Sequence, residues 1–224
     1  MARNDGDPAI PARVRRRPQQ QRSKAVYERV MEHARHLARE RDFDAISIQE
    51  LARGAGCSIG SFYYRFGTKD EFFRVLVDDM IARRDEAVVD TFRIHKVEDL
   101  PGELAREAVA NHRAYAGLLR SIIKKHLEGK PVWEPISLLG HRIAAEYVRR
   151  VAEARGVPLS RAQIERISFA FVWLYGLLAQ GLLGLNAVYS LEMSFFEEEA
   201  IASFQQAISH ALETEDGWEN RPAS

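Results

Sequence analysis

The sequence predicts an all-α protein. Apolar residues recur at helical spacing from Val26 onward, and no segment shows the alternating pattern of a strand. Breaks that contain glycine or proline fall at 100–102, 129–131 and 156–158, and a further break lies near 186–190. The segments between these breaks are long enough for helices and apolar enough to form a core. We therefore expect an N-terminal three-helix unit followed by a helical bundle.

The composition fits a folded protein of the cytoplasm. Of the 224 residues 46% are hydrophobic, which excludes global disorder, and the formal net charge is zero. The single cysteine, Cys57, excludes an internal disulfide framework and suits a reducing compartment. The N-terminus is polar and rich in arginine, without the apolar segment of a secretory signal. We expect a cytoplasmic location.

Charge is distributed unevenly along the chain. Residues 1–24 contain seven Lys or Arg, whereas residues 192–220 contain eight Asp or Glu and no Lys or Arg. This asymmetry suggests two surfaces with different partners. The stretch 169–185 is apolar apart from Gln180, but it is short for a membrane span and contains three glycines. We interpret it as a buried helix of a soluble bundle, and we expect no membrane partner.

Four segments follow from these patterns. Residues 1–21 contain three prolines in a polar, basic run, and we interpret them as a flexible basic arm. Residues 22–82 form the three-helix unit, and residues 83–214 form the larger helical domain. Residues 215–224 lack helical periodicity and are expected to be a disordered tail.

Capping signals place the short helices of the N-terminal unit. The first helix is predicted to begin at Ser23 and to end at Asp42. Ser47, with Glu50 three residues later, predicts a capping box at the start of a second helix. Ser58 is the expected N-cap of a third helix that ends near residue 66.

Two short helices joined by a glycine-containing turn are typical of a helix-turn-helix. Residues 54–56 supply the turn, and the second helix of the pair presents residues 58–64 outward. Gly60 allows close approach to bases, Ser61 offers a short donor and acceptor, and Ile59 offers an apolar contact. Free amides at the helix N-termini favour phosphate. The pattern indicates binding to a DNA groove.

The order of features over residues 22–82 resembles the TetR family of bacterial regulators. The resemblance is carried by F-D-A-x-S-I-x-x-L-A-x-x-A-G-x-S, then G-S-F-Y-Y-x-F, then T-K-D-E-F-F. It implies a homodimeric repressor that a small ligand releases from double-stranded operator DNA. It implies that Ser47, Tyr63 and Lys69 contact the DNA backbone and that Ile59, Ser61 and Tyr64 read bases. The full predicted DNA site is Ser47, Ser58, Ile59, Gly60, Ser61, Tyr63, Tyr64 and Lys69.

The sequence departs from the family pattern at two positions in this unit. Asp42 stands where glycine is usual, and we expect it to tolerate a left-handed helix terminus. Ile59 stands where lysine or another polar residue is frequent, so base preference cannot be transferred from the family. The basic arm is also longer than is typical.

The two C-terminal helices are the predicted homodimer interface. The helix from Ser160 to about Leu185 is apolar nearly all round, and a single bundle covers only one of its sides. The last helix carries apolar residues, among them Phe195, Phe196 and Phe204, that would complete a four-helix interface. We expect charged substitutions at Leu177 or Phe204 to give a monomer.

Aromatic and aliphatic residues in the larger domain predict a mainly apolar cavity for a small-molecule effector. The candidate ligand-binding residues are Phe92, His112, Tyr115, Leu119, Trp133, Tyr147 and Trp173. Thr68, with Glu71, predicts a capping box that starts a long helix ending near Ile94. This helix would connect the cavity to the DNA-binding unit, so that a ligand could change the distance between the two recognition helices of a dimer.

Several other interpretations stay open at this point. Cys57 could sense redox state, although a buried hydrophobic role is favoured, and His33 with His36 lacks a third metal ligand. We expect no metal and no cofactor, and the sequence holds no P-loop, no GxSxG, no HExxH and no GxGxxG. An enzyme with an incidental helix-turn-helix is therefore a remote alternative. A ligand-independent architectural DNA-binding protein is the other, and the large aromatic-rich domain argues against it.

Overall fold

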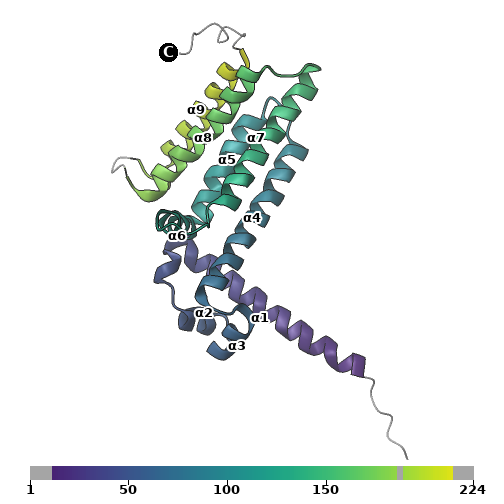
Figure 1. The fold of residues 1–224 in the computed structure, drawn as a ribbon, viewed down its shortest axis with the longest axis vertical. Helices are drawn as coiled ribbons and strands as arrows, with labels where there is room; N and C mark the ends of the chain where they lie inside the picture. The colour runs from purple at the N-terminus through teal and green to yellow at the C-terminus, as the bar shows by residue number, and fades with distance from the viewer. Residues whose placement is uncertain (1–11, 186–188, 214–224) are drawn as a thin grey trace, which may run out of the picture.

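The computed structural model describes residues 12–185 and 189–213, with side chains from residue 23 onward, and this part of the chain is helical without strands (Figure 1). The all-α prediction is confirmed. The elements are α1 (Ala12–Glu40), η1 (Phe43–Ala45), α2 (Ile48–Gly54), α3 (Ile59–Phe66), α4 (Lys69–Ile94), α5 (Leu100–Ala114), α6 (Ala116–Leu127), α7 (Glu134–Arg155), α8 (Arg161–Leu183) and α9 (Ser194–Glu213).

The first helix is longer than the sequence pattern predicts. It begins at Ala12 and not at Ser23, so residues 12–21 continue α1 toward the N-terminus. Arginine and glutamine, which dominate this stretch, are good helix formers even where no apolar periodicity marks a buried face, whereas Pro18 is unfavourable in a helix interior. Residues 1–11 of the expected arm and the whole expected tail, residues 215–224, lie outside the described residues.

A compact aromatic core holds α1, α2, α3 and the start of α4 together. Phe62 is fully buried, and its ring lies 5.0 Å from that of Phe66 and 4.9 Å from that of Phe72. Tyr27 of α1 stacks on Phe66 with ring centroids 5.3 Å apart. Edge-to-face and tilted pairs of this kind contribute roughly 0.5–1.5 kcal/mol each beyond their area burial. The inner side of α3 is therefore fixed against its neighbours.

The predicted caps are largely confirmed. Ser58 Oγ accepts a hydrogen bond from Ser61 N at 3.1 Å, and Thr68 and Glu71 form a complete capping box at the start of α4. Ser47 Oγ accepts from Glu50 N at 3.1 Å, but the reciprocal half of the expected box is missing. The carboxylate of Glu50 binds Arg41 instead, because an oppositely charged partner competes with the backbone amide.

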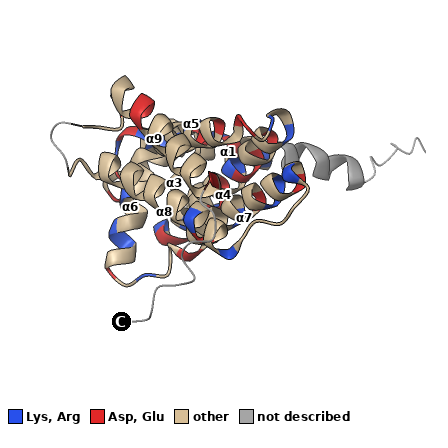
Figure 2. Cartoon of the chain, turned by 90° about the horizontal axis from the view of Figure 1, so that it is seen from above, with Lys and Arg blue, Asp and Glu red and all other residues tan. Residues whose placement is uncertain are grey.

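The larger domain is a bundle in which α8 packs against α7 and α9, while α5 packs against α4, α8 and α9 (Figure 1). Within the described residues α8 is the one helix long and apolar enough to cross a membrane by length and composition. Its contacts with α5, α6, α7 and α9 are those of a bundle helix. Acidic and basic residues are interspersed over the helices in the view of Figure 2, as expected for zero formal net charge.

Candidate DNA-binding and effector sites

The outer face of α3 exposes large side chains that a folded protein normally buries. Tyr64 is 90% exposed, and Tyr63 and Ile59 are also exposed, whereas Phe62 and Phe66 turn inward. Gly60 lies on the exposed face, and a Cβ added there would meet no atom within 4 Å. These four predicted DNA-site residues therefore form one accessible surface on a rigid support.

Three further predicted DNA-site residues stand at helix N-termini. Ser47 and Ser58 cap α2 and α3, and Lys69 is the first residue of α4. Lys69 is half-buried, with Nζ donating to the Asp44 carbonyl oxygen at 2.8 Å and lying 5.3 Å from the centroid of the Phe43 ring. Burial lowers the pKa of Lys69, and the nearby Asp44 opposes that shift. Lys69 thus ties α4 to η1, and its ammonium group has further N–H donors available for a phosphate.

The remaining predicted DNA-site residue, Ser61, is engaged by a residue that the sequence analysis missed. Arg65 donates through Nη1 to the carbonyl oxygen of Ser61 at 3.0 Å and also to Ser61 Oγ. The spacing of four residues on one helix face was the available signal.

The turn of the helix-turn-helix has the conformation that its glycine allows. Gly56 has φ +63°, in the left-handed region, and Arg29 of α1 donates from Nε to the Ala55 carbonyl oxygen at 2.9 Å. Cys57 is half-buried and packs against the core, and the ring of His33 lies against Gly54. Both side chains thus take part in packing the module.

The expectation for Asp42 is wrong. Its φ is −58°, and none of the described residues other than glycine has positive φ. A left-handed terminus is not needed, because the chain leaves α1 through an extended residue. The carboxylate of Asp42 instead accepts a hydrogen bond from Arg120 Nε at 2.6 Å.

This ion pair belongs to a junction between α6 and the DNA-binding module that the sequence did not reveal. Ser121 Oγ accepts from Phe43 N at 2.9 Å and donates to the Gly117 carbonyl oxygen at 3.0 Å. Gly117 is buried so closely that an added Cβ would lie 2.0 Å from the Arg41 carbonyl oxygen. Salt bridges from α6 to Asp44 and Asp70 surround the contact. The effector domain therefore holds the module through α6 as well as through α4.

A second group of buried polar side chains lies where α4, α5 and α8 meet. Arg84 lies with Nε 3.5 Å from Glu107 Oε2 and donates through Nη2 to the Tyr175 hydroxyl at 3.2 Å. His112 Nδ1 is 2.8 Å from the Ala108 carbonyl oxygen, and its ring stacks beside Tyr175 with centroids 6.4 Å apart. We call these four residues, Arg84, Glu107, His112 and Tyr175, the polar cluster.

The electrostatics of the polar cluster are those of a site sheltered from water. Burial lowers the pKa of His112 to about 4, with a further contribution from Arg84, so its ring is neutral at pH 7. Burial also raises the pKa of the Glu107 carboxyl, even though Arg84 is beside it. Arg84 Nε and Glu107 Oε2 are both buried and make no hydrogen bond within the described residues. These two atoms lie 3.5 Å apart and form an ion pair with each other, without a hydrogen bond of good geometry.

The predicted ligand-binding residues are not gathered into one site. Phe92, Leu119 and Tyr147 are buried in the hydrophobic core, and Tyr115 and Trp133 pack against it. His112 alone belongs to the polar cluster. Trp173 lies elsewhere, on the outer side of α8, where it is 38% exposed. The aromatic content of the sequence selected mostly core residues, because the core of a bundle and the lining of a cavity have the same amino-acid composition.

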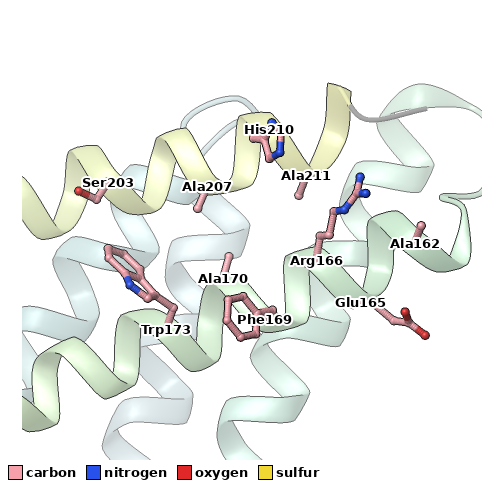
Figure 3. Close-up of a pocket in the computed structure, with 10 residues that line it drawn as sticks. All are labelled: Ala162, Glu165, Arg166, Phe169, Ala170, Trp173, Ser203, Ala207, His210 and Ala211. Atoms are coloured by element: carbon pink, nitrogen blue, oxygen red, sulfur yellow. The ribbon is translucent and has the colours of Figure 1, made fainter. Parts of the chain in front are cut away.

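Trp173 lines two grooves between α8 and α9. The larger has a volume of about 680 Å³, and Figure 3 shows Phe169 and Trp173 from α8 beside small residues of α9. Its lining is Ala162, Glu165, Arg166, Phe169, Ala170, Trp173, Ser203, Ala207, His210 and Ala211. The smaller, of about 350 Å³, continues past Leu177 to Phe195.

Comparisons with known proteins agree with this architecture. The family model described as bacterial regulatory proteins, tetR family, matches residues 30–76. The HTH-type transcriptional regulator EthR of Mycolicibacterium smegmatis is 27% identical over 114 residues, which are 46% of this chain and 50% of that protein. The match therefore spans half the length of this curated relative.

Solved structures share the fold over most of the chain. A transcriptional regulator from Cytophaga hutchinsonii has a TM-score of 0.64 at 13% identity, covering 83% of this chain and 96% of that one. A TetR-family regulator from Mesorhizobium loti has a TM-score of 0.61 at 20% identity, covering 84% and 98%. These proteins and EthR are named as regulators and not as enzymes. The family model thus lies on the helix-turn-helix, and the helical architecture that follows it is shared with these structures, so the N-terminal unit is similar to that of TetR-family regulators and the chain has the fold of these proteins.

Proposed function

We propose that this chain is a cytoplasmic, sequence-specific DNA-binding repressor that acts as a homodimer and is released from its operator by a small, largely apolar or aromatic ligand. The observation that carries the proposal is the outer face of α3, where Ile59, Tyr63 and Tyr64 are exposed around the open Gly60. A soluble monomer gains nothing by exposing such a surface, whereas a DNA groove offers methyl groups, base edges and phosphates to it.

The DNA-binding part of the proposal assigns two kinds of contact. The Tyr63 hydroxyl, the Lys69 ammonium and the N-termini of α2 and α3 face phosphates, which fix the position of the module. Ile59, Ser61 and Tyr64 contact base edges, which determine sequence preference. In a dimer two such modules meet half-sites about 34–36 Å apart or at multiples of that distance.

A binding selection on randomised duplexes with the full-length protein tests this part. We expect an enriched inverted repeat and an affinity that falls steeply with salt. Tyr63→Phe should weaken binding to every sequence about equally, whereas Ile59→Ala should change which sequences are preferred. Tyr189→Phe, at an exposed tyrosine that precedes α9, is the matched control. Recovery of no enriched sequence would refute the proposal.

The dimer is proposed to form through the outer faces of α8 and α9. Phe169 is 69% exposed, and Val172, Trp173 and Phe195 are exposed along the same pair of helices. The small residues of the larger groove leave room for side chains from a second copy (Figure 3). Phe204 has to be removed from the expected interface, because it is 0% exposed and packs on Phe171 at 5.0 Å. Phe196 is likewise buried inside the protomer.

The effector is proposed to bind at the polar cluster. A ligand with an aromatic body and a hydroxyl group could insert into the 3.5 Å ion pair between Arg84 Nε and Glu107 Oε2, two buried atoms without a well-formed hydrogen bond. Its hydroxyl would donate to the carboxylate and accept from the guanidinium. RolR, a protein that shares the fold at a TM-score of 0.52 and 19% identity, has been solved with the ligand resorcinol, an aromatic diol. Its chemistry makes phenols a reasonable first class of probe.

The position of the cluster suggests how binding changes DNA affinity. Arg84 lies on α4, the helix whose first turn contacts the DNA-binding module. A ligand that enters between α4, α5 and α8 has to part these helices, which displaces α4 and changes the distance between recognition helices. A coupling of roughly 1–3 kcal/mol would weaken operator binding about 5- to 150-fold.

A thermal-shift screen of resorcinol and other simple phenols tests the effector site. We expect a stabilising compound to release the selected duplex, and the duplex to weaken binding of the compound by the same factor. Glu107→Gln and Tyr175→Phe should reduce the shift, whereas Glu98→Gln, at an exposed carboxylate between α4 and α5, should leave it unchanged. A compound that binds at the cluster and leaves DNA affinity unaltered would contradict the switch.

A further inference from the structure

The recognition helix contains an internal contact that bears on base preference. Arg65 reaches back one turn of α3 and donates through Nη1 to both the carbonyl oxygen and the hydroxyl oxygen of Ser61. Ser61 is half-buried beside the exposed face, next to Gly60 and one turn before Tyr64. The inference rests on the proposed function, in which Ser61 faces a base edge.

The guanidinium of Arg65 is held in place between α3 and α1. Its Nη2 points to Ser23 Oγ of α1 at 3.5 Å, and Nε is buried without a hydrogen-bond partner. The stacking of Tyr27 on Phe66 keeps α1 alongside α3 at this point. No carboxylate forms a salt bridge with Arg65 in the described part of the chain. The guanidinium therefore contacts the Ser61 hydroxyl without a competing carboxylate among the described residues.

This contact affects the donor and the acceptor capacity of the Ser61 hydroxyl differently. A serine hydroxyl has one proton to donate and two lone pairs that accept. Arg65 occupies one lone pair, and its charge disfavours a second donor at the other. The same charge polarises the O–H bond, so that donation by the hydroxyl is strengthened. The Ser61 hydroxyl is thus favoured as a hydrogen-bond donor over a second role as acceptor.

The bases differ in the acceptor atoms that they present to a hydrogen-bond donor in the major groove. Guanine offers N7 and O6, adenine offers N7, and thymine offers O4, whereas cytosine offers only its N4 amino group, which is itself a donor. We propose that Arg65 is a specificity-determining positioning residue: by holding Ser61 as a hydrogen-bond donor, it makes the regulator reject cytosine at the base that Ser61 faces.

The experiment is a binding selection with the full-length wild type and with Arg65→Met, Arg65→Lys and Ser61→Ala. In the wild type we expect one half-site position from which cytosine is depleted. Ser61→Ala should abolish that depletion, which identifies the position. Arg65→Met should raise relative binding of the cytosine duplex about three- to tenfold, the range expected for one hydrogen bond. Arg65→Lys should restore part of the depletion, because it returns a positive donor.

The control is Arg53→Met, which removes the same charge from the exposed last turn of α2. It should weaken all duplexes and leave the base preference unchanged. Thermal denaturation establishes that each variant is folded. If Arg65→Met weakens every duplex equally and cytosine stays depleted, Arg65 is a phosphate contact and the inference is wrong. If the wild type enriches no sequence, the proposed function fails first, and the two failures are distinct.

Discussion

Phe169 offers the sharpest test of the proposed dimer. A phenylalanine side chain can bury about 150–200 Å², and Phe169 is 69% exposed in the protomer. Covering it would therefore remove roughly 100–140 Å² from water per ring. At about 25 cal/mol per Å², the two rings of a symmetric dimer would contribute an upper limit of roughly 5–7 kcal/mol.

Phe169→Glu should therefore dissociate the dimer. If half of the upper limit is offset by ordering of side chains at the interface, the dissociation constant still rises about 100-fold. Two carboxylates that face each other across the two-fold axis would add repulsion. Sedimentation velocity with fluorescence detection at about 10 nM and about 1 µM protein would resolve the two species, since a nanomolar dimer weakened about 100-fold has a dissociation constant of about 0.1 µM and is mostly monomeric at the lower concentration.

Val89→Glu is the matched control, because Val89 is 58% exposed but lies on α4. That variant should remain dimeric. Circular dichroism should show the same helix content for both variants, because neither position contributes to the core. A folded Phe169→Glu protein that sediments as a dimer at about 10 nM would refute the assignment of the interface to this face.

Three further changes follow from burial and close packing. Phe204→Glu should unfold the protein and not merely dissociate it, at a cost above about 3 kcal/mol, and loss of the circular dichroism signal at 37 °C checks this. Gly117→Ala should lower the free energy of unfolding by about 1–3 kcal/mol, because its Cβ would meet the Arg41 carbonyl oxygen, while Gly60→Ala in open space should raise it by up to about 1 kcal/mol; urea denaturation compares them. The folded-state pKa of His112, about 4, lies below the ordinary value, so stability present above pH 6.5 is lost as the pH falls toward 4. The loss at pH 5 relative to pH 7.5 should be about 2 kcal/mol smaller in His112→Gln, and an equal loss in both proteins would contradict the reasoning.

The sequence was informative wherever neighbouring residues determine structure. Thr68 and Ser58 cap their helices as predicted, because a cap needs only residues three positions apart. The exposed face of α3 was also predicted correctly, because it follows from the helical spacing of neighbouring residues. The start of α1 was misplaced, since helix propensity without apolar periodicity gave no signal at Ala12.

Long-range partners could not be predicted in the same way. Ser121 binds Phe43 N across 78 residues, and nothing in either local sequence marks the pair. Arg84 and Glu107 look like ordinary surface charges within charged stretches, and only the packing of α4 on α5 buries them together. Phe204 was assigned to the wrong side of α9, because a helix with apolar residues on several sides does not show which side turns inward.

The junction of Gly117 and Ser121 with the end of α1 has a consequence for avidity. In a dimer, binding of the first recognition helix presents the second to its half-site at an effective concentration that depends on how stiffly the two are connected. A module tethered by α4 alone would sample many orientations, and only a few of them would match the second half-site. Its effective concentration at that half-site would therefore be low. Bracing by α6 restricts that volume, so matched half-sites gain affinity and wrongly spaced ones are penalised. Operator spacing is then read by the rigidity of this contact, without any side chain touching the intervening bases.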